Sequence, residues 1–394
     1  MLRPAGRCVE ERAKKYRFSH GVSIDRVDSL CPRMLSFASF ACTEWSPWRS
    51  RNAMANLIVG FPSFLAQQLL AVLRQEFPSR PNHLLVLPEH IDEARKILGR
   101  PQGVSIHRGS ASSVDLGLSA ESIERLLPSV KHIFYFGLGQ GQGSGGRRSH
   151  RRRMEATRQL LRFASECHEP PRLMILSSLF VLGQGSGVVN AEAAAVQPDL
   201  RNGLESSLLA QERLVISSGL SWTLLRPGLV IGDSRTGHID RLGGIYRLGI
   251  LASQMPKGLP LPLPSRRARV HAVAADTLAV AAARLASSVR AHQRFVVIDH
   301  PQPLPSRTLV QAIAERNGLK ARGLAAGFDL ARPFTTLFAG RSQAARDFAY
   351  LNDTLTYRAD TSEQLLRDLD IQMPPPAELM RLAIKFTADR IRTQ

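Results

Sequence analysis

Short apolar runs alternate with amphipathic stretches along the chain from residue 55 onward. The apolar run Leu57 to Gly60 predicts a buried strand, and the stretch Ser63 to Gln75 places four leucines on one helical face. Further strands are predicted at 83–87, 104–107, 132–136, 173–176 and 222–225, and helices at 91–98, 119–127, 154–166 and 204–218. Strands that alternate with helices in this way are typical of a parallel sheet with helices on both faces.

This alternation predicts an α/β fold in which a Rossmann-type, doubly wound parallel sheet occupies residues 54–252. After residue 252 the pattern changes, because a series of prolines interrupts any helix up to residue 264. The sequence then predicts strands at 270–273 and 294–298, helices at 276–286 and 307–317, and a mostly helical tail from 328 onward. Residues 253–394 are therefore predicted to form a small mixed α/β C-terminal lobe with a helical tail.

Residues 1–53 differ from the rest of the chain. They combine Arg, Lys, Ser and Cys without a periodic apolar face, and they lack the continuous apolar core of a secretory signal. We predict a disordered leader here, or upstream sequence translated from a mistaken start, because Met54 precedes the first convincing strand. Both alternatives stay open.

Composition limits the surroundings and partners of the chain. No apolar run in its 394 residues reaches the roughly 18 residues of a membrane span. Four cysteines without a Cys-x-x-Cys pair predict neither a disulfide scaffold nor a metal site, and they favour a reducing, cytoplasmic location. The formal charge of +19 comes from scattered residues, which favours a solvated surface over attraction to nucleic acid or another acidic partner.

One basic cluster is an exception to this scatter. The segment Arg147 to Arg153 contains five arginines and follows a Gly-rich stretch at 137–146, which we interpret as a flexible excursion. The arginines fit a solvated helix start, and they also fit a docking site for a phosphopantetheine, an acidic carrier protein or RNA phosphates. Because no aromatic residue interleaves with them, nucleic-acid binding is the less favoured alternative.

The most informative stretch lies between residues 222 and 240. The mostly apolar run 222–225 meets Arg226-Pro227-Gly228, and a second apolar run, 229–231, meets Gly232-Asp233. The pattern predicts a buried strand that feeds a turn, in which Pro227 fixes φ and Gly228 lets the backbone approach another group closely.

This turn is one of several motifs that occur in a familiar order. Leu116-Gly117-Leu118-Ser119, Ser177-Ser178 and the segment 232–237 accompany it. The ordered set closely resembles the extended short-chain dehydrogenases/reductases, in the branch of fatty acyl and thioester reductases (male-sterility type), over residues 54–320. The resemblance implies that Pro227 and Gly228 lie against the nicotinamide end of a bound NAD or NADP. It also implies a C-terminal substrate lobe and an acyl thioester or acyl carrier protein as partner.

The first strand–helix turn departs from the family. Relatives read G-x-x-G-x-x-G there, whereas this chain reads Gly60-Phe61-Pro62-Ser63-Phe64-Leu65-Ala66. The resemblance assigns the cofactor's pyrophosphate to Gly60, Ser63, Phe64 and Leu65. Ser63 carries a Cβ where the phosphates should pass, and Pro62 lacks a backbone donor. We therefore expect NAD or NADP binding to be weakened or lost.

Two positions on the adenosine side of the cofactor are also changed. Where relatives carry an Arg for a 2′-phosphate or an Asp for a ribose, this chain has Pro88, and we interpret the neighbouring Glu89 as an exposed acid at a helix start. The family's Gly-Asp pair after the third strand is Gly109-Ser110, so Ser110 replaces the acid that faces the adenine. The choice between NAD and NADP stays open.

The family's hydride transfer uses a Tyr as acid/base, a Lys four residues later and a Ser that orients the substrate oxygen. Ser178 fits the serine position, although a hydroxyl that caps the backbone explains it equally well. The flanking Asn202 and Glu212 fix the register of the Tyr/Lys helix, and they place Leu204 at the Tyr position and Leu208 at the Lys position. Neither leucine can transfer a proton or hold a charge.

Other polar residues receive structural interpretations. Asp233 and Asp240 are predicted to cap turns, and the isolated His238 and His271 to be structural.

Three hypotheses follow from these residues. The first is a pseudoenzyme that binds a nucleotide or an acyl group after its redox chemistry was lost. The second is an oxidoreductase with a non-standard proton donor, for example Tyr135. The third is a non-enzymatic adaptor that binds an acidic partner through Arg147 to Arg153.

Overall fold

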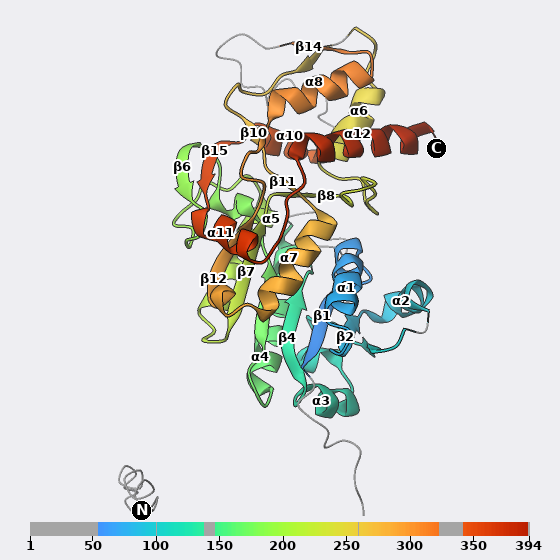
Figure 1. The fold of residues 1–394 in the computed structure, drawn as a ribbon, viewed down its shortest axis with the longest axis vertical. Coiled ribbons are helices and arrows are strands. Elements are labelled where there is room, and N and C mark those ends of the chain that lie inside the picture. Colours follow the sequence, from blue (N-terminus) through green and yellow to red (C-terminus); the bar gives the residue numbers. More distant parts are fainter. Residues whose placement is uncertain (1–53, 100, 138–145, 259, 323–341, 393–394) are drawn as a thin grey trace, which may run out of the picture. The chain divides into compact units, whose positions relative to one another are not determined.

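The computed structural model describes residues 54–99, 101–137, 146–258, 260–322 and 342–392 (Figure 1). The predicted leader, residues 1–53, lies outside the described residues. So do most of the Gly-rich stretch, at 138–145, and residues 323–341 of the predicted tail.

Seven parallel strands form the central sheet in the order β12–β7–β5–β4–β1–β2–β3. They are β1 (Ala55–Phe61), β2 (Asn82–Val86), β3 (Val104–Arg108), β4 (Val130–Tyr135), β5 (Arg172–Leu176), β7 (Trp222–Pro227) and β12 (Arg294–Ile298). The strand order reverses between β1 and β4, as in a doubly wound sheet. The predicted α/β, Rossmann-type fold is confirmed.

Helices cover both faces of this sheet (Figure 1). The first face packs against α1 (Phe64–Glu76), α7 (Ala275–Ser287) and α11 (Asp360–Asp368). The second packs against α3 (Ala120–Leu126), α4 (Arg147–Glu166) and α5 (Gly203–Ile216). A short helix, α2 (Ile91–Leu98), follows β2.

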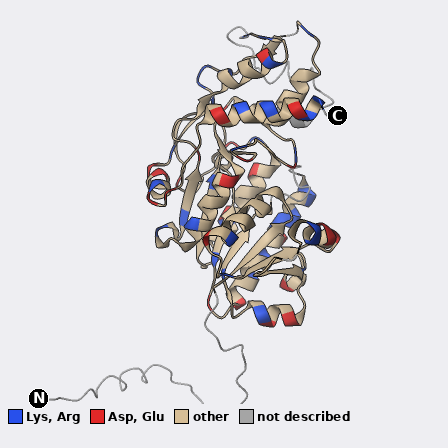
Figure 2. Cartoon of the chain, turned by 45° about the vertical axis from the view of Figure 1, so that its right-hand side comes forward, with Lys and Arg blue, Asp and Glu red and all other residues tan. Residues whose placement is uncertain are grey.

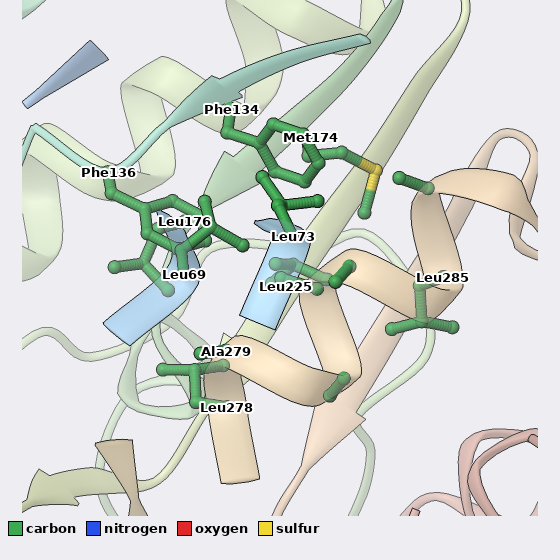
Figure 3. Close-up of a cluster of buried hydrophobic side chains, with 14 of the residues drawn as sticks. Leu69, Leu73, Phe134, Phe136, Met174, Leu176, Leu225, Leu278, Ala279 and Leu285 are labelled. Atoms are coloured by element: carbon green, nitrogen blue, oxygen red, sulfur yellow. The ribbon is translucent and has the colours of Figure 1, made fainter. Parts of the chain in front are cut away.

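Successive side chains along each strand point to opposite faces of the sheet. Ile58 points to the first face, whereas its neighbours Leu57 and Val59 point to the second. Figure 3 shows the first face, where leucines of α1 and α7 meet Phe134, Phe136 and Met174. This burial of apolar area fixes the strand ends that carry the candidate site.

A second apolar cluster belongs to the C-terminal lobe. Its helices are α6 (Ile245–Ser253), α8 (Ser306–Arg316), α10 (Ser342–Leu351) and α12 (Pro376–Arg392). Short strands accompany them, namely β8 (Leu229–Ile231), β9 (Pro260–Pro262), β10 (Arg269–Val270), β11 (Ala272–Ala274), β13 (Leu304–Pro305) and β14 (Lys320–Arg322). α7, β12 and α11 follow residue 252 but pack on the main sheet, and the division of the chain at that residue stays a prediction.

A pair of strands outside the main sheet was not predicted. β6 (Ser186–Asn190) pairs in parallel with β15 (Thr354–Arg358), which interrupts the predicted helical tail. Most residues of β6 are exposed, so its sequence lacks the apolar alternation by which strands are recognised.

Charged residues of both signs are spread over the helices and loops of the described chain, in keeping with the predicted scatter (Figure 2). Within the same residues, no helix combines the length and apolarity that crossing a membrane requires.

Candidate functional site

The first strand–helix turn places its residues at the carboxyl end of β1. Gly60 has a positive φ of 116°, and a Cβ there would lie 3.1 Å from the carbonyl oxygen of Phe136. The amide of Ser63 donates to the carbonyl of Gly60 at 3.0 Å and closes the turn. Phe64 and Leu65 then form the first turn of α1, where backbone N–H groups have no acceptor within the helix. A helix therefore starts directly after the turn, and its contact with a pyrophosphate stays a prediction.

Ser63 itself does not cap this helix. Its side chain makes no capping hydrogen bond, and its buried Oγ finds no partner among the described residues. A buried hydroxyl without a partner is costly, and the Cβ that carries it stands where the family's glycine would leave room for the phosphates. Phe64 points elsewhere, because its ring lies edge-on against His238 with centroids 5.5 Å apart.

On the adenosine side of the site, the 109–117 loop is held by a backbone hydrogen bond within the loop. The amide of Ser110 donates to the carbonyl of Leu116 at 2.7 Å, and its hydroxyl pairs with that of Ser112 at 3.1 Å. Leu116 has a positive φ of 57°, which turns the 109–117 loop back toward β3. Glu89 is exposed, as predicted, and lies in the short 3₁₀ helix Pro88–His90. Ser110 thus contributes to loop structure.

A small cavity remains where the resemblance places adenosine. It measures about 50 Å³, and Gly60, Leu87, Ser110, Tyr135 and Arg152 are among the residues that line it. Ligand pockets usually have volumes of roughly 300–1,000 Å³. This cavity is smaller than that range, and the weakening or loss of NAD or NADP binding stays a prediction.

Tyr135 occupies part of this space. A Cβ added to Gly137 would lie 2.5 Å from the Tyr135 ring, so the ring packs directly on that glycine. Burial raises the pKa of Tyr135, and the nearby Arg153 offsets this only in part. A buried phenol with a raised pKa is a weaker acid than a free tyrosine. This raised pKa does not favour Tyr135 as the replacement proton donor.

Two serines end β5, and each is engaged within the protein. The buried Ser177 donates to Oε1 of Glu212 at 2.6 Å. The Oγ of Ser178 accepts from the backbone N–H of Phe180 at 3.3 Å and caps the 3₁₀ helix Leu179–Leu182. Ser178 thus has the backbone-capping contact expected of a structural serine, and its contact with a substrate stays a prediction.

Leu204 and Leu208 lie on the first two turns of α5. Leu208 is 2% exposed, and both leucines belong to a small apolar cluster with Val181, Leu209 and Leu200. Asn202 begins this helix by accepting from the amides of Leu204 and Glu205 at 2.9 and 3.1 Å. The positions assigned to a phenol and an ammonium group are therefore packed with hydrocarbon.

A different phenol approaches the start of α5. Tyr350 of α10 accepts a hydrogen bond from Nδ2 of Asn202 at 2.7 Å, and its ring packs on Phe180 with centroids 4.7 Å apart. Burial, followed by the adjacent carboxylate of Glu205, raises the pKa of Tyr350. This contact was not predicted, because 148 residues separate Asn202 from Tyr350. Its raised pKa disfavours Tyr350 as an acid/base.

The Arg226-Pro227-Gly228 motif has a structural explanation that sequence reasoning missed. The prediction that Arg226 and Pro227 form a turn is wrong, because β7 continues to Pro227 and pairs with β12 up to that residue. Arg226 is fully buried and forms a bidentate pair with Glu212 at 2.9 and 2.6 Å. Its Nη1 donates to the carbonyls of Ala191 and Ala193. Each nitrogen of this guanidinium thus has a hydrogen-bond acceptor.

Gly228 allows another group to approach closely, as predicted, and in the structure this group is the backbone of His271 and Ala272. A Cβ there would lie 2.6 Å from the carbonyl carbon of His271 and 2.8 Å from the amide of Ala272. The predicted contact of Pro227 and Gly228 with a nicotinamide stays a prediction. Asp233 caps the next turn, as predicted, by accepting from the amides of Arg235 and Thr236 at 3.0 Å.

The basic cluster lies on a longer helix than predicted. α4 begins at Arg147, seven residues before the predicted start at Met154. Most of the cluster is exposed, but Arg153 is 2% exposed, so the prediction that the whole run 147–153 presents itself to a partner is wrong at that residue. Helical periodicity turns Arg153 inward toward Tyr135. Arg152 lines the small cavity described above.

Cys167, which lies outside the predicted leader, is unreactive because of its surroundings. Cys167 is buried and free, and burial raises its pKa to about 12. A thiol of this kind is neither a nucleophile nor a ligand at neutral pH. Among the described residues, no group of three or more His, Cys, Asp or Glu side chains is arranged to hold a metal ion.

The sequence of this chain matches the model of a known protein family. The profile described as "Male sterility protein" matches residues 85–282. A curated relative, fumosorinone synthetase of Cordyceps fumosorosea (strain ARSEF 2679), is 26% identical over 271 residues. The match covers 62% of this chain and 6% of the synthetase, so this chain spans a small part of the length of the curated relative it matches.

Solved structures share the fold over most of the chain. The terminal R domain from the myxalamid PKS-NRPS biosynthetic pathway has a TM-score of 0.68 and 19% identity, covering 86% of this chain and 92% of that domain. A thiolation-reductase di-domain from an archaeal non-ribosomal peptide synthetase has a TM-score of 0.64 and 12% identity, covering 87% of this chain and 76% of that one. At these identities the likeness concerns the fold.

Proposed function

This chain belongs to the male sterility protein family of extended short-chain dehydrogenases/reductases, and on that premise we propose that it has lost the hydride transfer of its relatives. We propose that it acts as a binding protein for a nucleotide or an acyl thioester. The thioester is free or attached to an acyl carrier protein. The predicted cytoplasmic location is part of this proposal.

The observation that carries the proposal is the packing of Leu204 and Leu208. A reductase of this fold needs a proton donor beside the acceptor carbon and a cation that adjusts its pKa. Both positions lie in an apolar cluster around Val181. The tyrosines near this end of the sheet, Tyr135 and Tyr350, have raised pKa values, so neither restores an acid of suitable strength.

The cofactor site supports weakened binding of NAD or NADP. The adenosine cavity has about 50 Å³ of space, and Ser63 places a side chain at the pyrophosphate turn. The start of α1 still offers backbone donors to an anion. These features favour a site that accepts a phosphate-bearing ligand with low affinity and does not turn it over.

Calorimetric titration of the full chain with NADPH, NADH and an acyl-coenzyme A tests the proposal, together with an assay for thioester-dependent NADPH oxidation. We expect weak binding and no oxidation above the rate without protein. The Ser63→Gly variant should bind NADPH more tightly, whereas Ser165→Gly, on an exposed position of α4, should not. NADPH oxidation that requires a thioester and disappears in Ser178→Ala would refute the loss of catalysis.

A second candidate is docking of an acidic partner through the start of α4. Arg147, Arg148, Arg151 and Arg152 are exposed within two turns, and no acidic residue stands in the first turn. Such a cluster attracts an acidic surface, and the attraction falls with salt. A pull-down with an acyl carrier protein at rising salt should show weaker binding for Arg148→Gln/Arg151→Gln. The exposed Arg95→Gln is the control, and equal binding by both variants would exclude this candidate.

A further inference from the structure

A buried charge cluster joins the start of α5 to the segment between α10 and β15. Arg201, the residue before the N-cap of α5, lies 3.6 Å from Oε1 of Glu205 on the first turn of that helix. The same guanidinium pairs with Oδ2 of Asp353 at 3.1 Å and donates to the carbonyl of Gly183 at 2.8 Å. All three charged side chains are at most 5% exposed. One guanidinium thus lies between two carboxylates from distant parts of the sequence.

Two tyrosines enclose this cluster. The phenol of Tyr357 in β15 donates to Oδ2 of Asp353 at 2.6 Å. The ring centroid of Tyr350 in α10 lies 5.5 Å from the guanidinium of Arg201, and its phenol stands beside the carboxylate of Glu205. Both carboxylates are consequently removed from bulk water.

Other titratable side chains around α5 have partners of their own. His150 of α4 pairs with Ser207 at 3.0 Å, and Glu212, two turns after Glu205, is held by Arg226. The charge of Glu205 is therefore governed by the guanidinium and the phenol that face it in the cluster.

The cluster contains one more carboxylate than it has cations. In the described part of the chain, Arg201 is the only cation that forms an ion pair with Glu205 or with Asp353. A buried charge without a counterion costs free energy, and desolvation favours the neutral form of such a group. Uptake of one proton removes the excess negative charge and leaves the packing unchanged.

Glu205 is the carboxylate that fits this proton. Its Oε2 accepts from the backbone N–H of Arg201 at 2.8 Å, in the manner of a capping box, whereas its buried Oε1 has no hydrogen-bond partner among the described residues. Asp353, by contrast, accepts through both oxygens, from the phenol of Tyr357 and from the amide of Leu355 at 3.2 Å. Burial, offset only in part by Arg201, raises the pKa of Glu205.

We propose that this cluster is a pH-sensitive latch, in which Glu205 binds a proton when α10 and β15 close on the start of α5. When the latch opens, water reaches the carboxyl group, and its pKa returns to the ordinary glutamate value of about 4.3. The closed state thus takes up a proton in the pH range between this value and the raised one. The stabilisation from this proton is complete below the ordinary pKa and is lost as the pH rises through the raised value.

The latch covers segments that carry predicted site residues. Tyr350 packs on Phe180, two residues after Ser178. It also binds Asn202, two residues before Leu204. Opening of the latch therefore uncovers both segments, and a rise in pH favours opening. The latch depends on the packing of the closed chain and is independent of the proposed loss of hydride transfer.

Amide hydrogen exchange of the full chain between about pH 5 and pH 7.5 tests this proposal, after correction for the intrinsic pH dependence of exchange. Protection of residues 347–358 should rise as the pH falls, by up to about tenfold per pH unit and by at least about threefold in total, because closing takes up one proton. Protection of α7, which is packed on the main sheet and reports opening of the whole fold, should not rise.

Glu205→Gln keeps the shape of the protonated side chain and cannot titrate, so residues 347–358 should lose this pH dependence. Glu121→Gln is the matched control, because it removes an exposed glutamate on the first turn of α3 that pairs with Arg125 at 2.8 Å, and it should keep the native dependence.

Protection of residues 347–358 that stays constant or decreases as the native chain is acidified would overturn the proposal, and this measurement does not depend on any variant folding. So would a pH dependence that Glu205→Gln retains in full. Neither measurement involves NADPH, so failure of the latch is distinguishable from failure of the proposed function.

Discussion

At Gly228 two backbone segments approach so closely that no side chain fits between them. The amide of Leu229 donates to the carbonyl of His271 at 2.8 Å, and the pairing of β8 with β11 begins there. The glycine of the family motif thus joins the Rossmann-type sheet to the C-terminal lobe, whether or not a cofactor is bound.

The Gly228→Ala variant should therefore be less stable than the native chain. A Cβ 2.6 Å from the His271 carbonyl carbon forces the two backbones apart, at an expected cost of about 1–3 kcal/mol in the free energy of unfolding. Urea unfolding followed by circular dichroism measures this cost. Gly243→Ala is the control, since its Cβ would meet only the far end of Arg247, and a loss of equal size there would contradict the explanation.

At the scale of single residues, some features of the candidate site could be predicted from the sequence and others could not. Spacing from Asn202 and Glu212 assigned Leu204 and Leu208 their positions, and the structure places both leucines on the first two turns of α5. The orphaned Ser63 Oγ and the Tyr350 contact could not be foreseen, because each depends on which atoms approach from distant segments. A sequence pattern specifies local geometry more firmly than long-range contacts.

At the scale of elements, the Arg226–Glu212 pair holds together the end of β7 and the helix α5. Ser177 at the end of β5 donates to the same carboxylate, and the carbonyls of Ala191 and Ala193 complete the shell. The guanidinium also lies over the Phe295 ring of β12 at 4.0 Å. The guanidinium thus links β7 to α5, to β12 and to the segment that follows β6, and its carboxylate partner also binds the residue after β5.

Removing one partner of this pair should be more damaging than removing both. Arg226→Leu leaves a buried carboxylate and should lower the free energy of unfolding by about 3–5 kcal/mol, and Glu212→Leu should do the same for the guanidinium. The double variant should lose less than the sum of the two single effects, because no uncompensated charge remains. A double-mutant cycle from denaturant unfolding measures the coupling, and strict additivity would show that the pair does not act as a unit.

Elements with strong apolar periodicity were predictable from the sequence, and the others were not. β12 and α2 have the predicted bounds, because their apolar residues follow the strand or helix period closely. β6 was missed because its pairing with β15 is exposed, and the early turns of α4 were missed because arginines give them no apolar face. The extension of β7 through Arg226 was missed because a buried arginine is recognised only when its carboxylate partner is known.

At the scale of the whole molecule, three strands of the sheet, β2, β3 and β4, bury histidines. Nδ1 of His83 in β2 lies 3.0 Å from Nε2 of His107 in β3, and Nδ1 of His132 in β4 lies 3.1 Å from Oδ1 of Asn56. Burial lowers the pKa of His83 to about 4, with the nearby His107 adding to the effect. Burial also lowers the pKa of His132 to about 4, with Arg80 and Arg172 contributing. The folded chain therefore keeps these rings neutral.

Global stability should accordingly fall as the pH drops from about 6.5 toward 4. In the unfolded chain these histidines bind protons below their ordinary pKa of about 6.5, while the folded state binds none until about pH 4, so acid favours unfolding in this window. The shifts of His83 and His132 should then each lower the free energy of unfolding by on the order of 3 kcal/mol at pH 4, and by nothing above pH 7. Urea unfolding between pH 4.5 and 7.5 measures the slope.

The formal charge of +19 also disfavours the folded state in acid, and salt separates the two causes. Repulsion between exposed charges weakens at high ionic strength, whereas the desolvation of a buried imidazole does not. The pH slope should therefore persist at 1 M salt and decrease in His132→Asn, which retains a hydrogen-bonding group beside Asn56. The exposed His90→Gln should keep the native slope. If salt abolished the slope, or if His132→Asn retained it in full, surface charge rather than the buried histidines would control the acid stability of this fold.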